Sequence, residues 1–295
     1  MRTISGSDAE GVRGAPVLVH DTPVERYMVR GIPILVKRED LCCPPPGPPF
    51  SKMRGVLAHV LARPEKTIGV LDTYHSQAGW AVAYACRIAS KHCVNYWPRY
   101  VHDGESLRDP QRRSLDLCAE LHALKAGRSA VLFHQAKKDL AARFGSSYMM
   151  PNALKLAESV RENAAEAERT APHLPDDRLA VVVSISSGTV AAGVLLGLAA
   201  AGVRFDAILH MGYTRSERVT RLYLQRMTGV PRLDERVEFV DEGYAYAERA
   251  RPLTTAVPFP CNEWYDLKAF RWMTEIGVLE RLAERGQIIF WNVGS

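Results

Sequence analysis

A single lysine stands at the end of a rigid, proline-rich segment of the chain. The stretch PPFSKMRG, residues 48–55, continues the run KREDLCCPPPG and places Lys52 where a helix is expected to begin. Proline fixes its own backbone and restricts the residue before it, so the chain that leads to Ser51 is stiff and irregular. A solvated surface lysine needs no such approach. The position therefore marks Lys52 as a candidate for chemistry and leaves its role open at this point.

A short run of small and hydroxyl-bearing residues follows an apolar strand later in the chain. In VVVSISSGTVAAGVLLGL, residues 181–198, an apolar segment leads to Ser186, Ser187, Gly188 and Thr189 and then to a helix of small residues. Backbone N–H groups at a helix N-terminus bind anions, and small residues let a phosphate group approach them. The loop matches neither GxGxxG nor the lysine-bearing P-loop, which argues against a dinucleotide or a nucleoside triphosphate. A plain helix cap with a tight turn remains the alternative.

A second loop of this kind lies in DTYHSQAGWAVAYACRIA, residues 72–89. A strand ends there, polar residues follow, and a helix of small residues is expected to begin at about Ala78. Ser76 and Gln77 would stand at that helix N-terminus, above the carboxyl end of the strand, where ligands of open α/β sheets bind. His75 is a candidate base, with helix capping or packing as its alternative role.

Two further polar positions lie near the C-terminus. In CNEWYDLKAFRW, residues 261–272, Tyr265 and Asp266 come directly before an amphipathic pattern. Asp266 is therefore either a site carboxylate or a capping, first-turn acid of a helix. The chain then ends in IIFWNVGS, an apolar strand with a small polar tail, which places this end near the site or at a partner interface.

The elements that must position these residues alternate along the chain. Seven apolar runs are expected to form strands: 32–37, 67–73, 93–98, 179–186, 205–211, 236–240 and 287–293. Eight segments are expected to form helices: 53–62, 78–90, 109–122, 129–143, 153–170, 189–201, 214–227 and 267–284. Several strands lack polar alternation, which is typical of parallel strands covered by helices on both faces. The pattern predicts an α/β protein with a mainly parallel sheet.

Composition narrows the class of protein further. The chain of 295 residues is 47% hydrophobic, has six cysteines without a CxxC pair, and carries a net charge of +5. We therefore expect no disulfide framework and no metal site, whereas an anionic substrate or weak nucleic-acid contact is allowed. No apolar run reaches the ~20 residues of a membrane span, and the N-terminus lacks a signal-peptide pattern. A cytoplasmic protein without a membrane segment is expected.

These segments, in this order, resemble one family. VKREDLCCPPPGPPFSKMRG is similar to the KREDL…GGNKxR segment of pyridoxal-phosphate (PLP) enzymes of fold type II, the tryptophan-synthase-β-like enzymes. HSQAG stands in place of an SNxxR loop, SISSGT resembles GSGGT, and VDEGYAYAE resembles DDYxGxGYG. EWYDLKAF resembles DPVYEGKAF, and FWNVGS resembles FIHTGG. The nearest branch contains aminocyclopropane-carboxylate (ACC) deaminase and D-cysteine desulfhydrase.

The resemblance implies a three-layer α/β/α fold with two intertwined subdomains, each built on a mainly parallel sheet. The larger, PLP-binding subdomain would comprise residues 1–52 and 153–295, and the smaller one residues 53–152. The charged, alanine-rich segment 152–178 is expected to cross between them. The family also implies a homodimer.

The resemblance assigns the cofactor roles. Lys52 would form the internal aldimine with PLP, and its desolvated approach beside Arg54 would lower the pKa of its amine. Four residues would hold the cofactor phosphate: Ser186, Ser187, Gly188 and Thr189.

The remaining assignments concern the ring and the substrate. Ser76 and Gln77 would face the substrate carboxylate and the ring oxygen of the cofactor. Tyr265 would lie over the site as an acid–base or ring-packing residue. Asp266 matches a glutamate that pairs with the pyridine nitrogen in the deaminase branch, where a carboxylate keeps the ring protonated and strengthens it as an electron sink.

Some positions depart from the family pattern. Pro49-Phe50-Ser51 replaces Gly-Gly-Asn, and Gln77 replaces an asparagine. Val293 and Ser295 stand where a threonine and a final glycine are expected. The loops that would face the substrate are thus altered.

Three hypotheses follow for the function. The first is a PLP enzyme that catalyses deamination, elimination or replacement on an amino acid or amine. The second is a PLP enzyme acting on an amino-acid group attached to a nucleotide or DNA, as in hypermodification, which would suit the altered loops and the mild basic charge. The third is a catalytically silent binding or assembly protein that keeps the fold, with Lys52 as an ordinary lysine.

Overall fold

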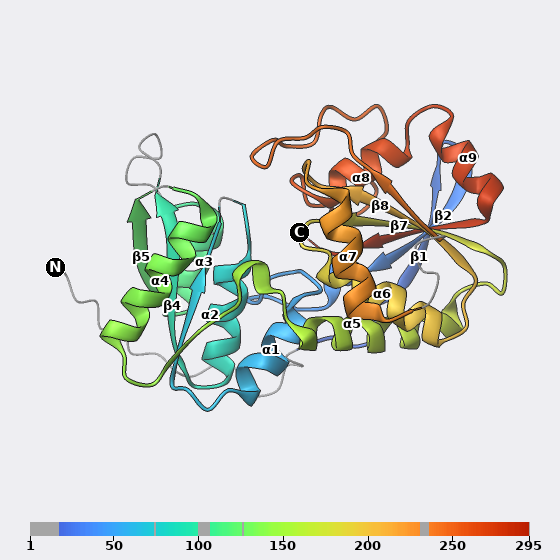
Figure 1. The fold of residues 1–295 in the computed structure, drawn as a ribbon. Coiled ribbons are helices and arrows are strands. Elements are labelled where there is room, and N and C mark those ends of the chain that lie inside the picture. The colour runs from blue at the N-terminus through green and yellow to red at the C-terminus, as the bar shows by residue number, and fades with distance from the viewer. Residues whose placement is uncertain (1–17, 74, 100–106, 126, 231–235, 295) are drawn as a thin grey trace.

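Two sheets form the framework of the chain in the computed structural model, and each lies in its own lobe (Figure 1). The structure describes residues 18–73, 75–99, 107–125, 127–230 and 236–294. None of the helices in these ranges has the length and apolar character that a bilayer span needs.

The larger sheet has six strands in the order β1-β2-β10-β7-β8-β9. Their bounds are β1 (Val24–Val29), β2 (Ile32–Arg38), β10 (Gln287–Asn292), β7 (Leu179–Ile185), β8 (Phe205–Met211) and β9 (Val237–Val240). The β1–β2 pair is antiparallel, and the other four pairs are parallel. Five helices accompany this sheet: α5 (Ala157–Thr170), α6 (Thr189–Ala200), α7 (Glu217–Thr228), α8 (Asp266–Met273) and α9 (Val278–Arg285).

Strand β7 is covered by helices on both faces, and this explains its apolar sequence. Val181 and Val183 pack into a core with α5, α6 and α7, whereas Ala180 and Val182 pack into a second core with α8 and α9. All residues of β7 are buried. A strand covered by helices on both faces has no side chain to give to solvent, so polar alternation disappears.

The smaller sheet has four parallel strands in the order β5-β4-β3-β6. Their bounds are β5 (Glu120–Lys125), β4 (His92–Arg99), β3 (Thr67–Leu71) and β6 (Ser147–Met149). Helices in this lobe are α1 (Met53–Ala62), α2 (Ala78–Ile88), α3 (Asp109–Asp116) and α4 (Ser129–Arg143). One core joins this sheet to α1 and α2, and a separate core joins it to α4.

The predicted three-layer α/β/α class with two mainly parallel sheets is confirmed. The larger sheet draws its strands from residues 24–38 and 179–292, and the smaller sheet from residues 67–149. Helix α5 packs against both α1 and α6, where the two lobes meet. The subdomain limits 1–52 with 153–295, and 53–152, stay a prediction.

The predicted helix 109–122 is wrong in its second half. Helix α3 ends at Asp116, and the edge strand β5 begins at Glu120. Cys118 has a left-handed backbone with φ +64°, and its N–H donates to the carbonyl of Leu115. A left-handed residue directly after the last turn ends a helix. Neither β5 nor the short strands β1 and β6 were among the predicted strands.

The predicted helix 267–284 is two helices. Helix α8 ends at Met273 and α9 begins at Val278, with Gly277 between them at φ +78°. The side chain of Glu280 accepts a hydrogen bond from the N–H of Gly277 at 2.8 Å, which caps the new helix. A glycine in this conformation and an acid three residues later set a fresh N-terminus.

Candidate functional site

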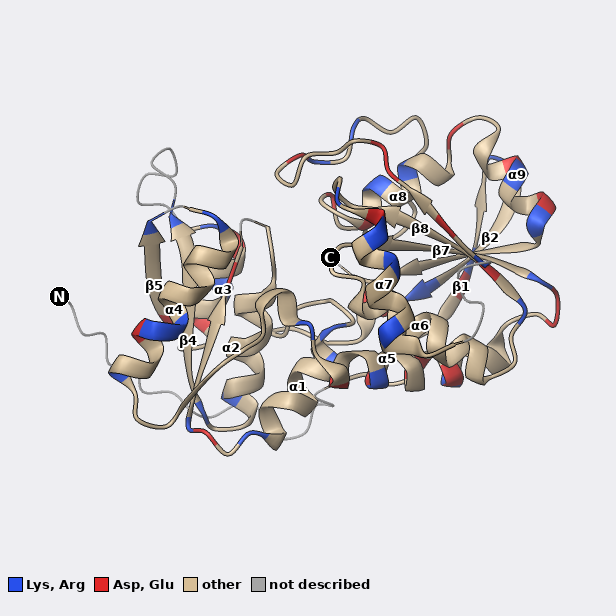
Figure 2. Cartoon of the chain, in the orientation of Figure 1, with Lys and Arg blue, Asp and Glu red and all other residues tan. Residues whose placement is uncertain are grey.

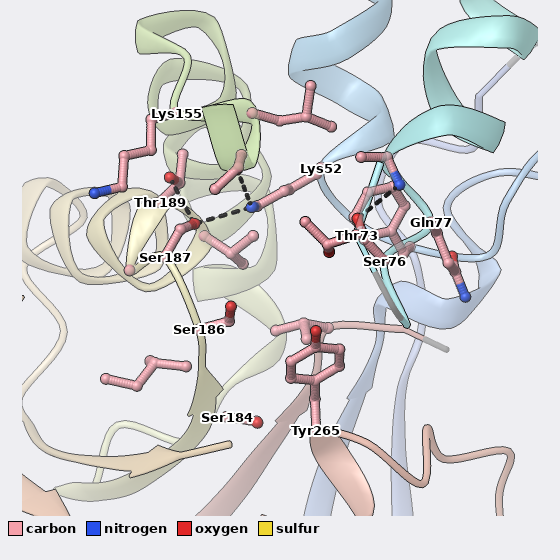
Figure 3. A pocket seen from close by; sticks show the side chains of 18 of the residues that line it. Lys52, Thr73, Ser76, Gln77, Lys155, Ser184, Ser186, Ser187, Thr189 and Tyr265 are labelled. Carbon is pink, nitrogen blue, oxygen red and sulfur yellow. Dashed lines mark hydrogen bonds between the residues drawn. The ribbon is translucent and has the colours of Figure 1, made fainter. Parts of the chain in front are cut away.

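A cavity of about 570 Å³ is lined by loops from both lobes (Figure 3). It lies at the carboxyl ends of β3 and β7, at the start of α1 and directly before α8. Eight of the nine predicted site residues line it: Lys52, Ser76, Gln77, Ser186, Ser187, Gly188, Thr189 and Tyr265. The ninth, Asp266, is buried and does not line the cavity.

The amine of Lys52 crosses the cavity toward the α6 loop. Lys52 immediately precedes α1, and its Nζ donates hydrogen bonds to the carbonyl of Ala153 and to Ser187 Oγ, both at 2.9 Å. Burial lowers the pKa of Lys52 to about 8, and the charges of Lys155 and Arg215 act in the same direction. An amine with this pKa is partly neutral near physiological pH and can act as a nucleophile.

The cations that neighbour Lys52 differ from the one expected. The sequence suggested Arg54, but its guanidinium is buried in ion pairs with Glu39 at 3.0 Å and with Glu166 at 3.4 Å. Lys155 and Arg215 line the cavity instead. Arg54 is two residues beyond Lys52 on a helix, and such neighbours point in different directions.

The loop before α6 forms an uncharged cup of hydroxyl and amide groups. Gly188 is the N-cap of α6 with φ +83°, a left-handed conformation that side chains rarely adopt. Ser187 Oγ and Thr189 Oγ1 lie 3.0 Å apart, and Thr189 Oγ1 lies 3.1 Å from the hydroxyl of Tyr223. The N-terminal N–H groups of an α-helix have no partner within the helix, so this end is suited to an anion.

The opposite wall carries the residues that precede α2. Ser76 Oγ accepts a hydrogen bond from the N–H of Ala78 at 2.9 Å, so this side chain caps the helix. Gln77 Oε1 on this wall and Ser184 Oγ, near the end of β7 on the side of the α6 loop, are buried and have no hydrogen-bond partner among the described residues (Figure 3). Buried polar atoms are normally paired. Two unpaired atoms in the wall of one cavity therefore fit a polar ligand.

His75 lies at the cavity as a packing residue. Its ring stacks on Trp264 with centroids 3.2 Å apart and planes 11° from parallel. Burial lowers the pKa of His75 to about 3, and the charges of Arg108, Arg249 and Lys268 lower it further. The imidazole is thus neutral at physiological pH, and the geometry supports the packing alternative over the base.

Tyr265 and its neighbour Asp266 face different surroundings. The ring of Tyr265 points into the cavity, and burial beside Tyr246 raises the pKa of its hydroxyl (Figure 3). Asp266 is the first residue of α8 and is completely buried. Burial raises its pKa well above the usual range, although the backbone amides of Val293 and Gly294 oppose that rise. The proposed contact of Asp266 with a ring nitrogen stays a prediction.

Four lining residues with a cationic or phenolic side chain were not among the predicted site residues: Lys155, Tyr213, Arg215 and Tyr246. Tyr246 stands in VDEGYAYAE, a segment that the family resemblance already singled out. Lys155 and Arg215 stand in no motif, so the sequence carried no signal for them. Among the described residues that line the cavity, none is an aspartate or a glutamate. Three cations therefore share the cavity without an acidic side chain.

A comparison with curated proteins identifies a relative of full length. The chain is 55% identical over 283 residues to the "Glycyl-dTMP PLP-dependent decarboxylase" of Pseudomonas phage M6, which covers 95% of this chain and 100% of the relative. The chain belongs to the family of this phage PLP enzyme. No family model matches the sequence.

Solved structures agree with this membership at the level of the fold. The "ACC deaminase homologue" superposes with a TM-score of 0.75 at 17% identity, over 95% of this chain and 90% of the other. A hydrogen sulfide-producing enzyme from Fusobacterium nucleatum gives a TM-score of 0.70 at 13% identity, over 98% of both chains. The chain is a PLP-dependent enzyme of fold type II, so the hypothesis of a silent protein is wrong.

The residues at the cavity fit this cofactor. Lys52 offers an amine of lowered pKa, and the Ser186–Thr189 loop offers an uncharged anion cup across from it. The unpaired Gln77 Oε1 and Ser184 Oγ offer further polar atoms on two sides of the cavity. The individual roles of these residues stay predictions.

Proposed function

We propose that the protein removes the carboxyl group of a glycyl unit attached to a thymidine nucleotide. The main support comes from the composition of the cavity. Lys52, Lys155 and Arg215 line it, and none of the described lining residues is acidic. Such a cavity favours a substrate with more than one negative charge. The phage relative, 55% identical over its whole length, is named for a glycyl nucleotide and for decarboxylation. Of the three hypotheses, this is the one with a nucleotide-linked amino acid.

The chemistry of the step is a simple replacement. When bound, PLP withdraws electrons from the carbon that carries the amino group. The bond from that carbon to the carboxylate breaks, carbon dioxide leaves, and one proton takes its place. Lys52 Nζ reaches into the cavity and can hold this proton, because a pKa of about 8 leaves the amine partly protonated at neutral pH.

The other cavity residues hold the reacting groups in place. Ser186, Ser187 and Thr189 would bind the cofactor phosphate at the N-terminus of α6. Ser76 and Gln77 would face the substrate at the start of α2. Tyr265 would cover the site from the start of α8, and Asp266 would be the partner of the ring nitrogen.

The test is direct. Purified protein with PLP is incubated with glycyl-dTMP, and the release of carbon dioxide and the mass of the nucleotide product are measured. We expect one carbon dioxide for each product molecule and no reaction with free glycine. An intact substrate after prolonged incubation of the PLP-loaded protein would contradict the proposal.

A second candidate is deamination or elimination on a small amino acid. It is favoured by Tyr265-Asp266, which resembles the tyrosine–glutamate pair of the deaminase branch. Ammonia release from aminocyclopropane-carboxylate or D-cysteine, without carbon dioxide, would identify this activity. The homodimer and the cytoplasmic location also stay predictions, and light scattering on the purified protein would test the first of them.

A further inference from the structure

The cavity holds a pair of cations that the cofactor roles do not use. Lys155 and Arg215 come from different segments of the larger lobe, one before α5 and one before α7. Their charges act on each other and on Lys52, so the three groups lie close together. Elsewhere, lysines and arginines are spread over the elements of both lobes (Figure 2). The pair is therefore distinguished by its position in the cavity lining and not by its residue types.

Aromatic rings, and not carboxylates, hold these two cations. Lys155 Nζ lies 4.8 Å from the centroid of the Tyr223 ring, and the Arg215 guanidinium lies 5.7 Å from that of Tyr213. Among the described residues, neither cation forms an ion pair. A cation over a ring keeps its charge available, because the interaction is weak at accessible sites. Both side chains can therefore turn toward an anion that enters the cavity.

The backbone before Lys155 is held in an unusual conformation. Ala153 and Leu154 have φ angles of +59° and +49°, in the left-handed region that non-glycine residues rarely occupy. Lys52 Nζ holds the carbonyl of Ala153 at 2.9 Å. Strained backbone persists where the surroundings fix it, and it concentrates at functional sites. This conformation brings Lys155 to the edge of the cavity.

The cavity thus contains two different anion-binding features. The Ser186–Thr189 cup is made of hydroxyl and amide groups, whereas the second feature consists of two full charges on long side chains. PLP brings one phosphate group, and a nucleotide-linked substrate brings another. Arginine and lysine bind phosphate strongly through charge-assisted hydrogen bonds.

We propose that Lys155 and Arg215 form a second phosphate site, which binds the phosphate of the nucleotide that carries the amino-acid group. The inference rests on the proposed function and specifies which part of the substrate is recognised. Tyr213, beside Arg215, also lines the cavity and offers a ring face to the base.

The experiment measures binding to the PLP-loaded protein by calorimetry, with dTMP, thymidine and the dinucleotide dTpT as probes. The variants are Lys155→Met and Arg215→Met. The matched controls are Lys138→Met on α4 and Arg218→Met on α7, both exposed and outside the cavity lining. PLP affinity is measured for every variant by titrating the apo-protein.

We expect dTMP to bind at least about 10-fold more tightly than thymidine, and each cavity variant to remove most of that difference. Thymidine and PLP affinities should change by less than about threefold, and the controls should behave like the wild type. Tighter binding of dTpT than of dTMP would also support the site, with the substrate inside a nucleic-acid strand.

Two results would overturn this inference. One is equal affinity of dTMP and thymidine for the wild type. The other is a loss of PLP affinity in the variants as large as the loss of dTMP affinity, which would assign the pair to the cofactor phosphate. If dTMP binds as expected but glycyl-dTMP releases no carbon dioxide, the proposed function fails while the phosphate site stands.

Discussion

Two clusters of positive charge lie near the start of helix α1, and they differ in how the charge is balanced. In the first, Lys37 and Arg54 pair with Glu39 and Glu166, and every one of these side chains is at most 1% exposed. In the second, Lys52, Lys155 and Arg215 face the cavity, where no described residue supplies a carboxylate. Lys52 and Arg54, only two residues apart in the sequence, therefore belong to different clusters.

The difference shows how charge separates a structural region from a binding region. A buried charge is costly unless a partner neutralises it, so the first cluster is complete within the chain. Uncompensated cations in a cavity repel one another and depress the pKa of a neighbouring amine. A chain accepts that cost where a ligand completes the balance.

The largest effect is expected at the reacting end of the second cluster. Lys52→Ala should abolish the visible absorbance band of the bound cofactor and reduce turnover by at least about 10³-fold, because the other amine of the cavity, Lys155, lies over the Tyr223 ring and not at the Lys52 position. Spectroscopy and a carbon dioxide assay measure both effects. Lys138→Ala on α4 serves as the control, and a variant that kept the band without Lys52 would remove this residue from the site.

Removing a carboxylate from the first cluster should lower the stability of the fold. Glu166→Ala leaves Lys37 buried without the carboxylate that it pairs with and leaves Arg54 with Glu39 alone, so the free energy of unfolding should fall by about 3–5 kcal/mol. Denaturant titration followed by circular dichroism measures this change. Glu168→Ala, on the exposed side of the same helix, should stay within about 0.5 kcal/mol of the wild type. Equal stability of the two variants would contradict the comparison.

Lowering the pH should remove the stabilising contribution of the first cluster gradually, as Glu166 becomes protonated. Burial raises the pKa of Glu166, but the charges of Arg54 and Lys37 outweigh it and lower the pKa to about 2, from an ordinary value of 4.5. A lowered carboxyl pKa stabilises the fold fully above the unfolded value and loses that contribution as the pH falls toward the folded value. The wild type should therefore lose more stability than Glu166→Gln between about pH 5 and pH 3. Parallel losses in both proteins would show that Glu166 carries no such linkage.

The smallest effect should appear in the pH dependence of cofactor uptake. The rate at which the apo-protein takes up PLP should rise with pH around the Lys52 pKa of about 8, since the neutral amine reacts. Lys155→Met and Arg215→Met should each move this midpoint upward by less than about one pH unit, because each removes a repelling charge. Stopped-flow absorbance measures the profile, with Lys138→Met as the control. An unchanged midpoint in both variants would place the two cations too far away to act.

The sequence predicted the central strands of both sheets, but it missed three of the four edge strands, β1, β5 and β6. Strands β2, β7, β8 and β10 were recognised because burial on both faces produces continuous apolar runs. Strand β5 was merged with a helix, since ELHALK lacks β-branched residues and lies at the sheet edge, where one side makes no strand contacts. The break between α8 and α9 depends on the conformation of one glycine, Gly277, which a helical pattern does not show.

The sequence by itself determined the family and the cofactor, and it singled out Lys52 and the Ser186–Thr189 loop as candidate cofactor residues. These features are short and contiguous, so residue types and order carry them. The tertiary structure alone decided which cations surround Lys52. Helix α1 turns Arg54 into the buried cluster, while the folding of distant segments brings Lys155 and Arg215 to the cavity. Contacts between residues that are about 100 or more positions apart depend on how whole elements pack, and no local pattern encodes that packing.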